Sequence, residues 1–261
     1  MGVVNVTPDS FSDGGMFLDR DAAVAHGARL AAEGAAILDV GGESTRPGAD
    51  PVPAAEELRR VIGVIEGLRT TGAQLSVDTS KLAVAQAALD AGASIVNDVT
   101  AFRGEPELAA LVAARGAECC LMHMLGTPRT MQDDPRYDDV VSEVKAFLEE
   151  RLAFAVAEGV AEERVMLDPG IGFGKTVEHN LELLRRLDEL VALGRPVVIG
   201  ASRKSFLGRI TGRESGDRAA ATAAVNVLAF ERGASVFRVH DVPETRDALA
   251  VTAATLAADG P

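Results

Sequence analysis

The sequence predicts a (β/α)8 barrel, and three observations lead to that fold. The chain has 261 residues, which suits one barrel-sized α/β domain or two small domains. Short apolar runs alternate with amphipathic helical patterns from one end of the chain to the other. Because no linker rich in Pro, Gly or Ser interrupts this alternation, residues 1–261 are expected to form a single domain. A doubly wound open sheet is the alternative fold.

Eight apolar runs have the length of strands. Each run is continuous rather than alternating, which is typical of parallel strands covered on both faces. In order, the predicted strands span residues 3–6, 36–40, 74–77, 94–99, 119–122, 165–167, 197–199 and 236–239.

Helical patterns fill the segments between these strands. The clearest spans residues 137–157, where Val140, Val144 and Leu148 fall on one apolar stripe. Seven of the predicted helices are followed by a glycine, the residue that best adopts the left-handed conformation after a helix. These glycines are Gly34, Gly72, Gly92, Gly116, Gly159, Gly194 and Gly233. Eight helices alternating with eight strands favour the barrel.

The charge and the cysteine content exclude several classes of protein. Lys and Arg number 26 against 39 Asp and Glu, so the formal net charge of -13 repels nucleic acid and anionic membranes. The start of the chain has no signal-peptide pattern, and no apolar run approaches the roughly 18 residues of a spanning helix. The only cysteines, Cys119 and Cys120, are adjacent, which excludes a disulfide framework. We therefore expect a cytoplasmic protein that binds neither nucleic acid nor membrane.

Polar residues follow nearly every predicted strand, where both candidate folds place their ligand sites. Two long loops rich in Gly, Ser and Pro, residues 5–15 and 41–48, follow the first two strands. A mere connection needs only about 2–6 residues, so these loops are expected to belong to an active site. The later strands end near Asp78, Asn97, His123, Asp168, Lys204, Arg238 and His240.

Seven motifs at these strand ends resemble those of the dihydropteroate synthase family in content and in order. The motifs are NVTPDSFSDGG at 5–15, GESTRPG at 42–48, DT at 78–79, ND at 97–98, DPGIGF at 168–173, SRK at 202–204 and RVHD at 238–241. The resemblance covers essentially the whole chain. It implies a pterin-binding barrel that joins p-aminobenzoate to 6-hydroxymethyl-7,8-dihydropterin diphosphate, releasing pyrophosphate.

The carboxylates at the strand ends suit a pterin ring. The pterin edge presents an exocyclic amine beside a ring N–H, and the two oxygens of a carboxylate match these parallel donors. We assign this edge to Asp168, the mixed donor and acceptor contacts to Asn97, and a further ring N–H to Asp78. One such aspartate is as readily a helix N-cap, but three such polar side chains at strand ends favour a site. The guanidinium of Arg238 would stack on the ring, and Lys204 would donate to the pterin carbonyl.

The expected chemistry is displacement of a diphosphate by an aryl amine. Because such an amine is nucleophilic when neutral, the main task is to stabilise the departing charge. Arg46, Arg238 and His240 are the candidates for this task, and Mg²⁺ is the expected cofactor. By resemblance, Asn5 contacts the metal and the diphosphate, and Asp13 stabilises positive charge at the methylene carbon. The predicted catalytic residues are Asp13, Arg46, Lys204, Arg238 and His240.

The resemblance also implies a subsite for p-aminobenzoate, built from Phe11, Thr45, Pro47, Phe173 and Ser205. Without the motif, Pro47 is equally consistent with a turn and Phe173 with the core. We expect this subsite to assemble after the diphosphate binds, and the enzyme to be a homodimer.

Several conspicuous residues are expected to have no catalytic role. Lys175 is predicted on a solvated rim, and His26 and His179 on helix surfaces. His123, between two methionines, is left open, with a hydrogen-bonded rim histidine as one interpretation. The glycines before Lys175 do not have the spacing of a phosphate-binding loop, which argues against an NTPase.

Two other functions fit part of the pattern. A pterin-binding methyltransferase that passes a methyl group from a methylated folate to a corrinoid protein would share the barrel and the pterin contacts. It would have no use for the diphosphate-binding motifs at 45–47, 202–204 and 238–240. A non-catalytic pterin-binding paralogue would be favoured by loss of Arg238, which is present.

Overall fold

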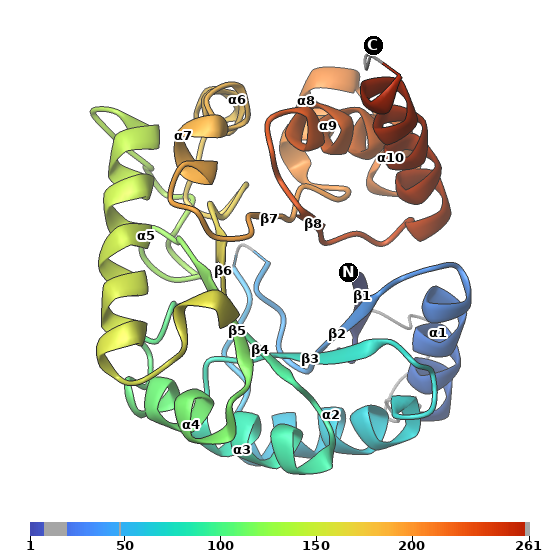
Figure 1. Cartoon of the computed structure of the whole chain (residues 1–261), viewed down its shortest axis with the longest axis vertical. Coiled ribbons are helices and arrows are strands. Elements are labelled where there is room, and N and C mark those ends of the chain that lie inside the picture. Colours follow the sequence, from blue (N-terminus) through green and yellow to red (C-terminus); the bar gives the residue numbers. More distant parts are fainter. Residues whose placement is uncertain (8–19, 47, 259–261) are drawn as a thin grey trace.

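In the part of the chain that the structure describes, eight parallel strands form the centre of the molecule (Figure 1). The computed structural model describes residues 1–7, 20–46 and 48–258. Strands β1 to β6 pair in sequence order and β7 pairs with β8. The strands are β1 Gly2–Asn5, β2 Ile37–Gly41, β3 Gln74–Asp78, β4 Ile95–Asp98, β5 Glu118–Met122, β6 Val165–Asp168, β7 Val198–Ile199 and β8 Val236–Phe237.

Two single parallel bridges connect the six-stranded and two-stranded sheets. One joins Leu167 in β6 to Val197 just before β7, and the other joins Gly2 in β1 to Val239 just after β8. The amide of Val3 also donates to the carbonyl of Val239 at 3.0 Å. The strands therefore close in order from β1 to β8. This confirms the predicted (β/α)8 barrel, and the doubly wound open sheet is wrong.

Helices surround the strands on the outside of this barrel (Figure 1). In the described residues there are two more α-helices than the eight predicted, because short α7 follows α6 and α8 precedes α9 in the connection from β7 to β8. They are α1 Arg20–Ala32, α2 Ala54–Leu68, α3 Leu82–Ala91, α4 Glu107–Arg115, α5 Val140–Ala157, α6 Val177–Arg185, α7 Asp188–Val191, α8 Ser205–Thr211, α9 Ala219–Glu231 and α10 Val242–Ala257.

Local chemistry sets the helix boundaries. The seven glycines predicted to follow helices all have positive φ, between 56° and 115°. Helix α5 begins at Val140 rather than at residue 137, because the Asp139 carboxylate accepts hydrogen bonds from the amides of Val141 and Ser142 at 3.1 and 3.4 Å. This is an aspartate N-cap.

No helix in the described residues is long and apolar enough to cross a membrane.

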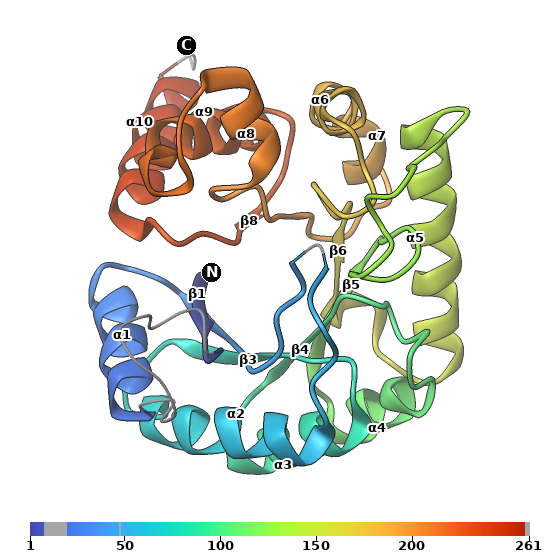
Figure 2. The same cartoon turned by 180° about the vertical axis from the view of Figure 1, so that it is seen from behind.

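The strand register brings polar side chains together at the carboxyl end of the barrel. Asp78 in β3 is level with Gly41 in β2 and with Asn97 in β4. Asp168 in β6 is level with Met122 in β5. Below this level the strands bury apolar side chains, including Val4, Leu38, Val77, Val96 and Leu121. The loop after β2, blue in Figure 2, projects across the centre of the ring of helices.

Candidate active site

A buried network of hydrogen bonds joins four strands at the carboxyl end of the barrel. Arg238, just after β8, donates from Nε to Oδ2 of Asp39 at 2.6 Å and from Nη2 to Oδ2 of Asp78 at 2.8 Å. Nδ2 of Asn97 donates to Oδ2 of Asp39 at 3.1 Å, and Oγ of Ser76 donates to Oδ1 at 2.6 Å. The guanidinium and the amide are therefore held in fixed orientations.

Burial governs the ionisation of this network. Burial raises the pKa of Asp78 to about 7, even though the neighbouring Arg238 acts in the opposite direction. Burial alone would lower the pKa of Arg238, but Asp39 and Asp78 raise it above its usual range. Arg238 therefore remains a cation in a site where Asp78 titrates near neutral pH.

Asp168 and Lys204 lie beside this network. Oδ1 of Asp168 accepts from the amide of Gly170 at 2.7 Å. A Cβ atom added to Gly200 would lie 3.8 Å from Oδ2 of Asp168 and 3.9 Å from Nζ of Lys204. Both charged groups therefore lie close to Gly200. Burial raises the pKa of Asp168 and lowers that of Lys204 to about 8. Nζ of Lys204 donates to the carbonyl of Ile171.

A second polar cluster joins the ends of β7 and β8. Oγ of Ser202 lies 2.9 Å from Nδ1 of His240 and accepts from the amide of His240 at 3.1 Å. Arg203 has a positive φ of 57° and forms an ion pair with Asp241, to which its Nε donates at 2.9 Å. Burial, together with Arg238 and Arg203, lowers the pKa of His240 to about 4. Although His240 was predicted as a cation for the leaving group, it is neutral at pH 7 in the free protein.

The predicted p-aminobenzoate residues come from three loops. Phe173 is half-buried after β6, and its ring centroid lies 4.4 Å from Nζ of Lys204. Thr45 is half-buried in the loop after β2, and Ser205 is exposed at the first turn of α8. Their roles in binding p-aminobenzoate stay predictions.

The remaining site predictions divide into described and undescribed residues. Asn5 is half-buried at the end of β1, and Arg46 is exposed in the loop after β2. Phe11, Asp13 and Pro47 lie outside the described residues.

The prediction for Lys175 is wrong, because its side chain is buried rather than solvated. Only 3% of the residue is exposed, and its Nζ lies 2.9 Å from Nδ1 of His123 and 3.0 Å from the carbonyl of Phe173. Burial lowers the pKa of Lys175 well below its usual value and lowers that of His123 to about 2. Lys175 therefore links the segment after β6 to His123 just after β5. His123 is a hydrogen-bonded histidine, which was one interpretation of the sequence.

The other two histidines are half-buried rather than on the helix surface. Nε2 of His26 lies 3.3 Å from the carbonyl of Val3. His179 completes the capping box of α6 with Thr176. Both contacts are structural.

Asp39 and Ser76 belong to the site but were not assigned from the sequence. Asp39 is fully buried and contacts Arg238, Asn97 and Ser76. The signal for Asp39 was a carboxylate inside the apolar segment 37–41, because a buried charge needs a partner. Ser76 carried no comparable signal.

Comparisons with known proteins show the family of this chain. The model of the pterin binding enzyme family matches residues 1–240. A dihydropteroate synthase of Mycobacterium leprae is 49% identical over 98% of this chain and 93% of that protein. A probable bifunctional folylpolyglutamate synthase/dihydropteroate synthase of Haloferax volcanii is 48% identical over 98% of this chain, which spans 30% of that protein's length.

The same likeness holds in three dimensions. A solved structure of Xanthomonas albilineans dihydropteroate synthase with 4-aminobenzoic acid superposes with a TM-score of 0.93 and 52% identity, over 100% of this chain and 93% of that one. The family match, the close relatives and the shared barrel lead to one conclusion: the chain belongs to the pterin-binding enzymes and, within them, to the dihydropteroate synthases.

Proposed function

We propose that this protein condenses p-aminobenzoate with 6-hydroxymethyl-7,8-dihydropterin diphosphate, forming 7,8-dihydropteroate and releasing pyrophosphate. The observation that carries the proposal is the meeting of Asp78, Asn97 and Asp168 beside Arg238 and Lys204 at one end of the barrel. Acceptors suited to a pterin edge thus lie next to cations suited to a departing diphosphate.

The hydrogen bonds within the protein leave several groups free to contact the pterin. Asp168 uses one lone pair of Oδ1 for Gly170, which leaves Oδ2 and the second lone pair of Oδ1 for the exocyclic amine and the adjacent ring N–H. Asn97 uses one N–H for Asp39, which leaves its carbonyl and its second N–H. The face of the Arg238 guanidinium is fixed by its carboxylate partners and supplies a surface for stacking.

The leaving group is assigned to the exposed Arg46 and to the cluster at the ends of β7 and β8. His240 begins neutral, and an adjacent diphosphate would raise its pKa and favour a proton on the ring. Arg238 contributes positive charge from the pterin side. These groups stabilise negative charge as the bond to the methylene carbon breaks.

Mg²⁺ is proposed as the companion of the diphosphate. In the described residues no group of three or more His, Cys, Asp or Glu side chains is arranged to hold a metal ion. Mg²⁺ bound with phosphates needs only one or two protein ligands, and the amide oxygen of Asn5 at the end of β1 fits that role. When bound, the ion would neutralise charge that develops on the leaving group.

The aryl amine is placed by Phe173, Thr45, Ser205 and the undescribed Phe11 and Pro47. The ring would pack on Phe173, and Ser205 would donate to the benzoate carboxylate. A neutral aryl amine attacks without prior deprotonation, so the subsite needs to orient the nucleophile rather than supply a base. Asp13 retains its proposed role near the methylene carbon.

A homodimer in the cytoplasm is proposed for the assembled enzyme. Exposed apolar side chains on the last helices support self-association. They include Leu228 in α9 and Leu256 and Val251 in α10, and Val251 is 68% exposed. Sedimentation of the purified protein tests the stoichiometry, and a monomer across the micromolar range would contradict it.

Pyrophosphate release tests the proposed reaction. The complete mixture contains the dihydropterin diphosphate, p-aminobenzoate and Mg²⁺, and three further mixtures each omit one component. We expect stoichiometric pyrophosphate and dihydropteroate only in the complete mixture. Release without p-aminobenzoate would indicate hydrolysis instead, and methyl transfer from a methylated folate would support the methyltransferase alternative.

A further inference from the structure

The loop between β5 and α5, residues 125–139, touches the loop after β2. The carbonyl of Pro128 accepts from the amide of Gly48 at 3.1 Å. Nearby, Nη1 of Arg129 lies 3.7 Å from Oδ1 of Asp50. The ion pair is exposed and contributes little, so the backbone hydrogen bond is the main link.

The same loop also touches the segment after β6. Nε2 of Gln132 donates to the carbonyl of Gly172 at 2.6 Å, and the hydroxyl of Tyr137 donates to the carbonyl of Gly174 at 2.8 Å. These two carbonyls flank Phe173. The loop 125–139 therefore bonds to the backbone on both sides of a predicted p-aminobenzoate residue.

An apolar contact reinforces this link. Met131 is 3% exposed and belongs to a small cluster separate from the main core, against which Phe173 packs. The other members of the cluster are Val99, Met122 and Met124, at the ends of β4 and β5. Phe173 thus packs against a cluster to which the loop 125–139 contributes Met131.

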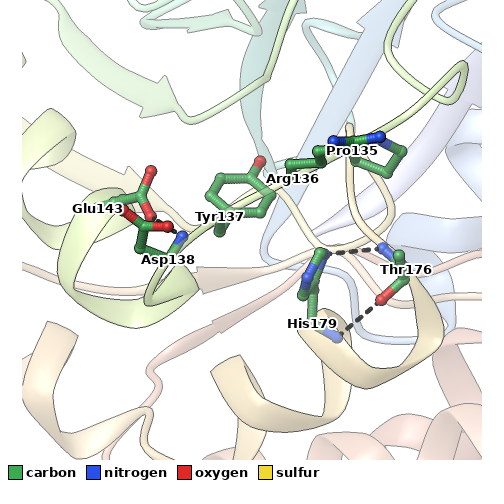
Figure 3. A pocket seen from close by; sticks show the side chains of 7 residues that line it. All are labelled: Pro135, Arg136, Tyr137, Asp138, Glu143, Thr176 and His179. Carbon is green, nitrogen blue, oxygen red and sulfur yellow. Dashed lines mark hydrogen bonds between the residues drawn. The ribbon is translucent and has the colours of Figure 1, made fainter.

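The far end of the loop is firmly anchored. Figure 3 shows Tyr137 close to His179 on the first turn of α6, with ring centroids 5.0 Å apart in an edge-to-face arrangement. The dashed lines between Thr176 and His179 mark the hydrogen bonds that cap α6. Asp139 then caps α5. The loop is therefore supported independently of any ligand.

We propose that the loop 125–139 positions the p-aminobenzoate subsite by linking its two walls, with Gln132 and Met131 as positioning residues. One wall is the loop after β2 that carries Thr45, and the other is the segment that carries Phe173. This inference rests on the proposed function, since it assigns a role in binding the second substrate. A change in one wall is transmitted to the other through residues 128–132.

The test compares Gln132→Ala with Asp133→Ala on the same exposed loop. Among the described residues, the Asp133 side chain has no hydrogen-bond or ion-pair partner, so it is a matched control. Gln132→Ala should raise the KM for p-aminobenzoate about three- to tenfold, as expected for loss of one hydrogen bond. The Kd for 6-hydroxymethylpterin and the Tm should stay as in Asp133→Ala.

Hydrogen exchange supplies a readout that a purely local effect would not change. In Gln132→Ala, exchange should be faster over residues 44–52, although the hydrogen bond of the Gln132 side chain goes to Gly172. Unchanged exchange there would overturn the proposal. So would equal KM values in the two variants, or losses of pterin affinity and Tm as large as the change in KM.

Two further comparisons keep the outcomes distinct. Met131→Leu retains an apolar side chain in the cluster against which Phe173 packs and should resemble the wild type, whereas Met131→Ala should raise the KM for p-aminobenzoate. If the wild-type protein makes no dihydropteroate, the proposed function fails. Hydrogen exchange at residues 44–52 in Gln132→Ala then still tests whether the loop 125–139 links the two walls, because that measurement needs no substrate.

Discussion

Asp39 holds Arg238 in place, since Oδ2 of the carboxylate accepts from Nε of the guanidinium at 2.6 Å. The same oxygen accepts from Asn97 at 3.1 Å, and Oδ1 accepts from Ser76 at 2.6 Å. Asp39 is fully buried, so it acts on a ligand through Arg238 and Asn97. It is a positioning residue that connects the pterin-binding and leaving-group sides of the site.

Replacing Asp39 with Asn should lower both stability and activity. The carboxamide keeps the shape but presents an NH2 group to donors, and truncating a buried ion pair costs about 3–5 kcal/mol. We expect a lower free energy of unfolding in urea and a fall in kcat/KM of at least about tenfold. Asp90→Asn, which breaks the exposed ion pair with Arg115, should change stability by less than about 1 kcal/mol. Equal behaviour of the two variants would contradict the role of Asp39.

Asp78 should make stability depend on pH. Its pKa is raised to about 7 by burial, whereas the unfolded chain has a value of about 3.9. The folded state therefore holds the proton more tightly between these two values. The associated stability is complete below about pH 4 and is lost as the pH rises through about 7. Urea unfolding of the wild type and Asp78→Asn across this range measures the effect, and parallel curves would contradict it.

Pterin affinity should change in the opposite direction. An ionised carboxylate is a stronger acceptor than a protonated one, so binding to Asp78 improves as the proton leaves. We expect the affinity for 6-hydroxymethylpterin to rise between about pH 6 and pH 8, and the rise to disappear in Asp78→Asn. Calorimetric titration gives the affinities, and a retained rise in the variant would assign the effect to another group.

His240 should gain a proton when pyrophosphate binds. Burial and the neighbouring Arg238 and Arg203 lower the pKa of His240 to about 4, so the ring is neutral at pH 7. A bound anion favours the charged ring. Calorimetry in buffers of different ionisation enthalpy should therefore show proton uptake that His240→Gln lacks. Equal uptake by the two proteins would place the proton elsewhere.

The barrel could be predicted because its buried parallel strands are continuous apolar runs. Asp78 and Asn97 could be predicted as neighbours because each lies near the end of such a run and parallel strands end at one edge. The residues that close the barrel could not be predicted, because closure depends on single bridges at Gly2 and Leu167. Helix α8 was not predicted, because its 7 residues are too few to show a helical period and it shares the connection from β7 to β8 with the longer α9.

The failures in the site have a common physical origin. The burial of Lys175 depends on His123, 52 residues earlier in the chain, and no local pattern encodes that pairing. The role of Asp39 depends on Arg238, 199 residues later. Local sequence places a polar side chain at a strand end, but only tertiary packing selects its partner.

Lys81 anchors the loop after β2 through two carboxylates. Its Nζ contacts Glu43 at the start of that loop and the fully buried Glu57 in α2. Burial alone would lower the pKa of Lys81, but the hydrogen bonds to both glutamates raise it, so the cation is retained. Oε1 of Glu43 also accepts from the amide of Val52 at 2.9 Å. Glu43 therefore ties both ends of the loop to the barrel.

Substitutions in the cluster of Lys81, Glu43 and Glu57 should distinguish an effect on the loop after β2 from an effect on the stability of the fold. Lys81→Met leaves two carboxylates facing each other without a cation and should reduce stability by about 3–5 kcal/mol. Glu43→Gln should raise the KM for p-aminobenzoate several-fold, because the loop that carries Thr45 loses its charged anchor. Glu57→Gln keeps the contact between Glu43 and Lys81, so its KM should remain near the wild-type value. Thermal unfolding and steady-state kinetics of the three variants measure both effects. If Glu57→Gln raised this KM as much as Glu43→Gln, the cluster would support only the packing of α2.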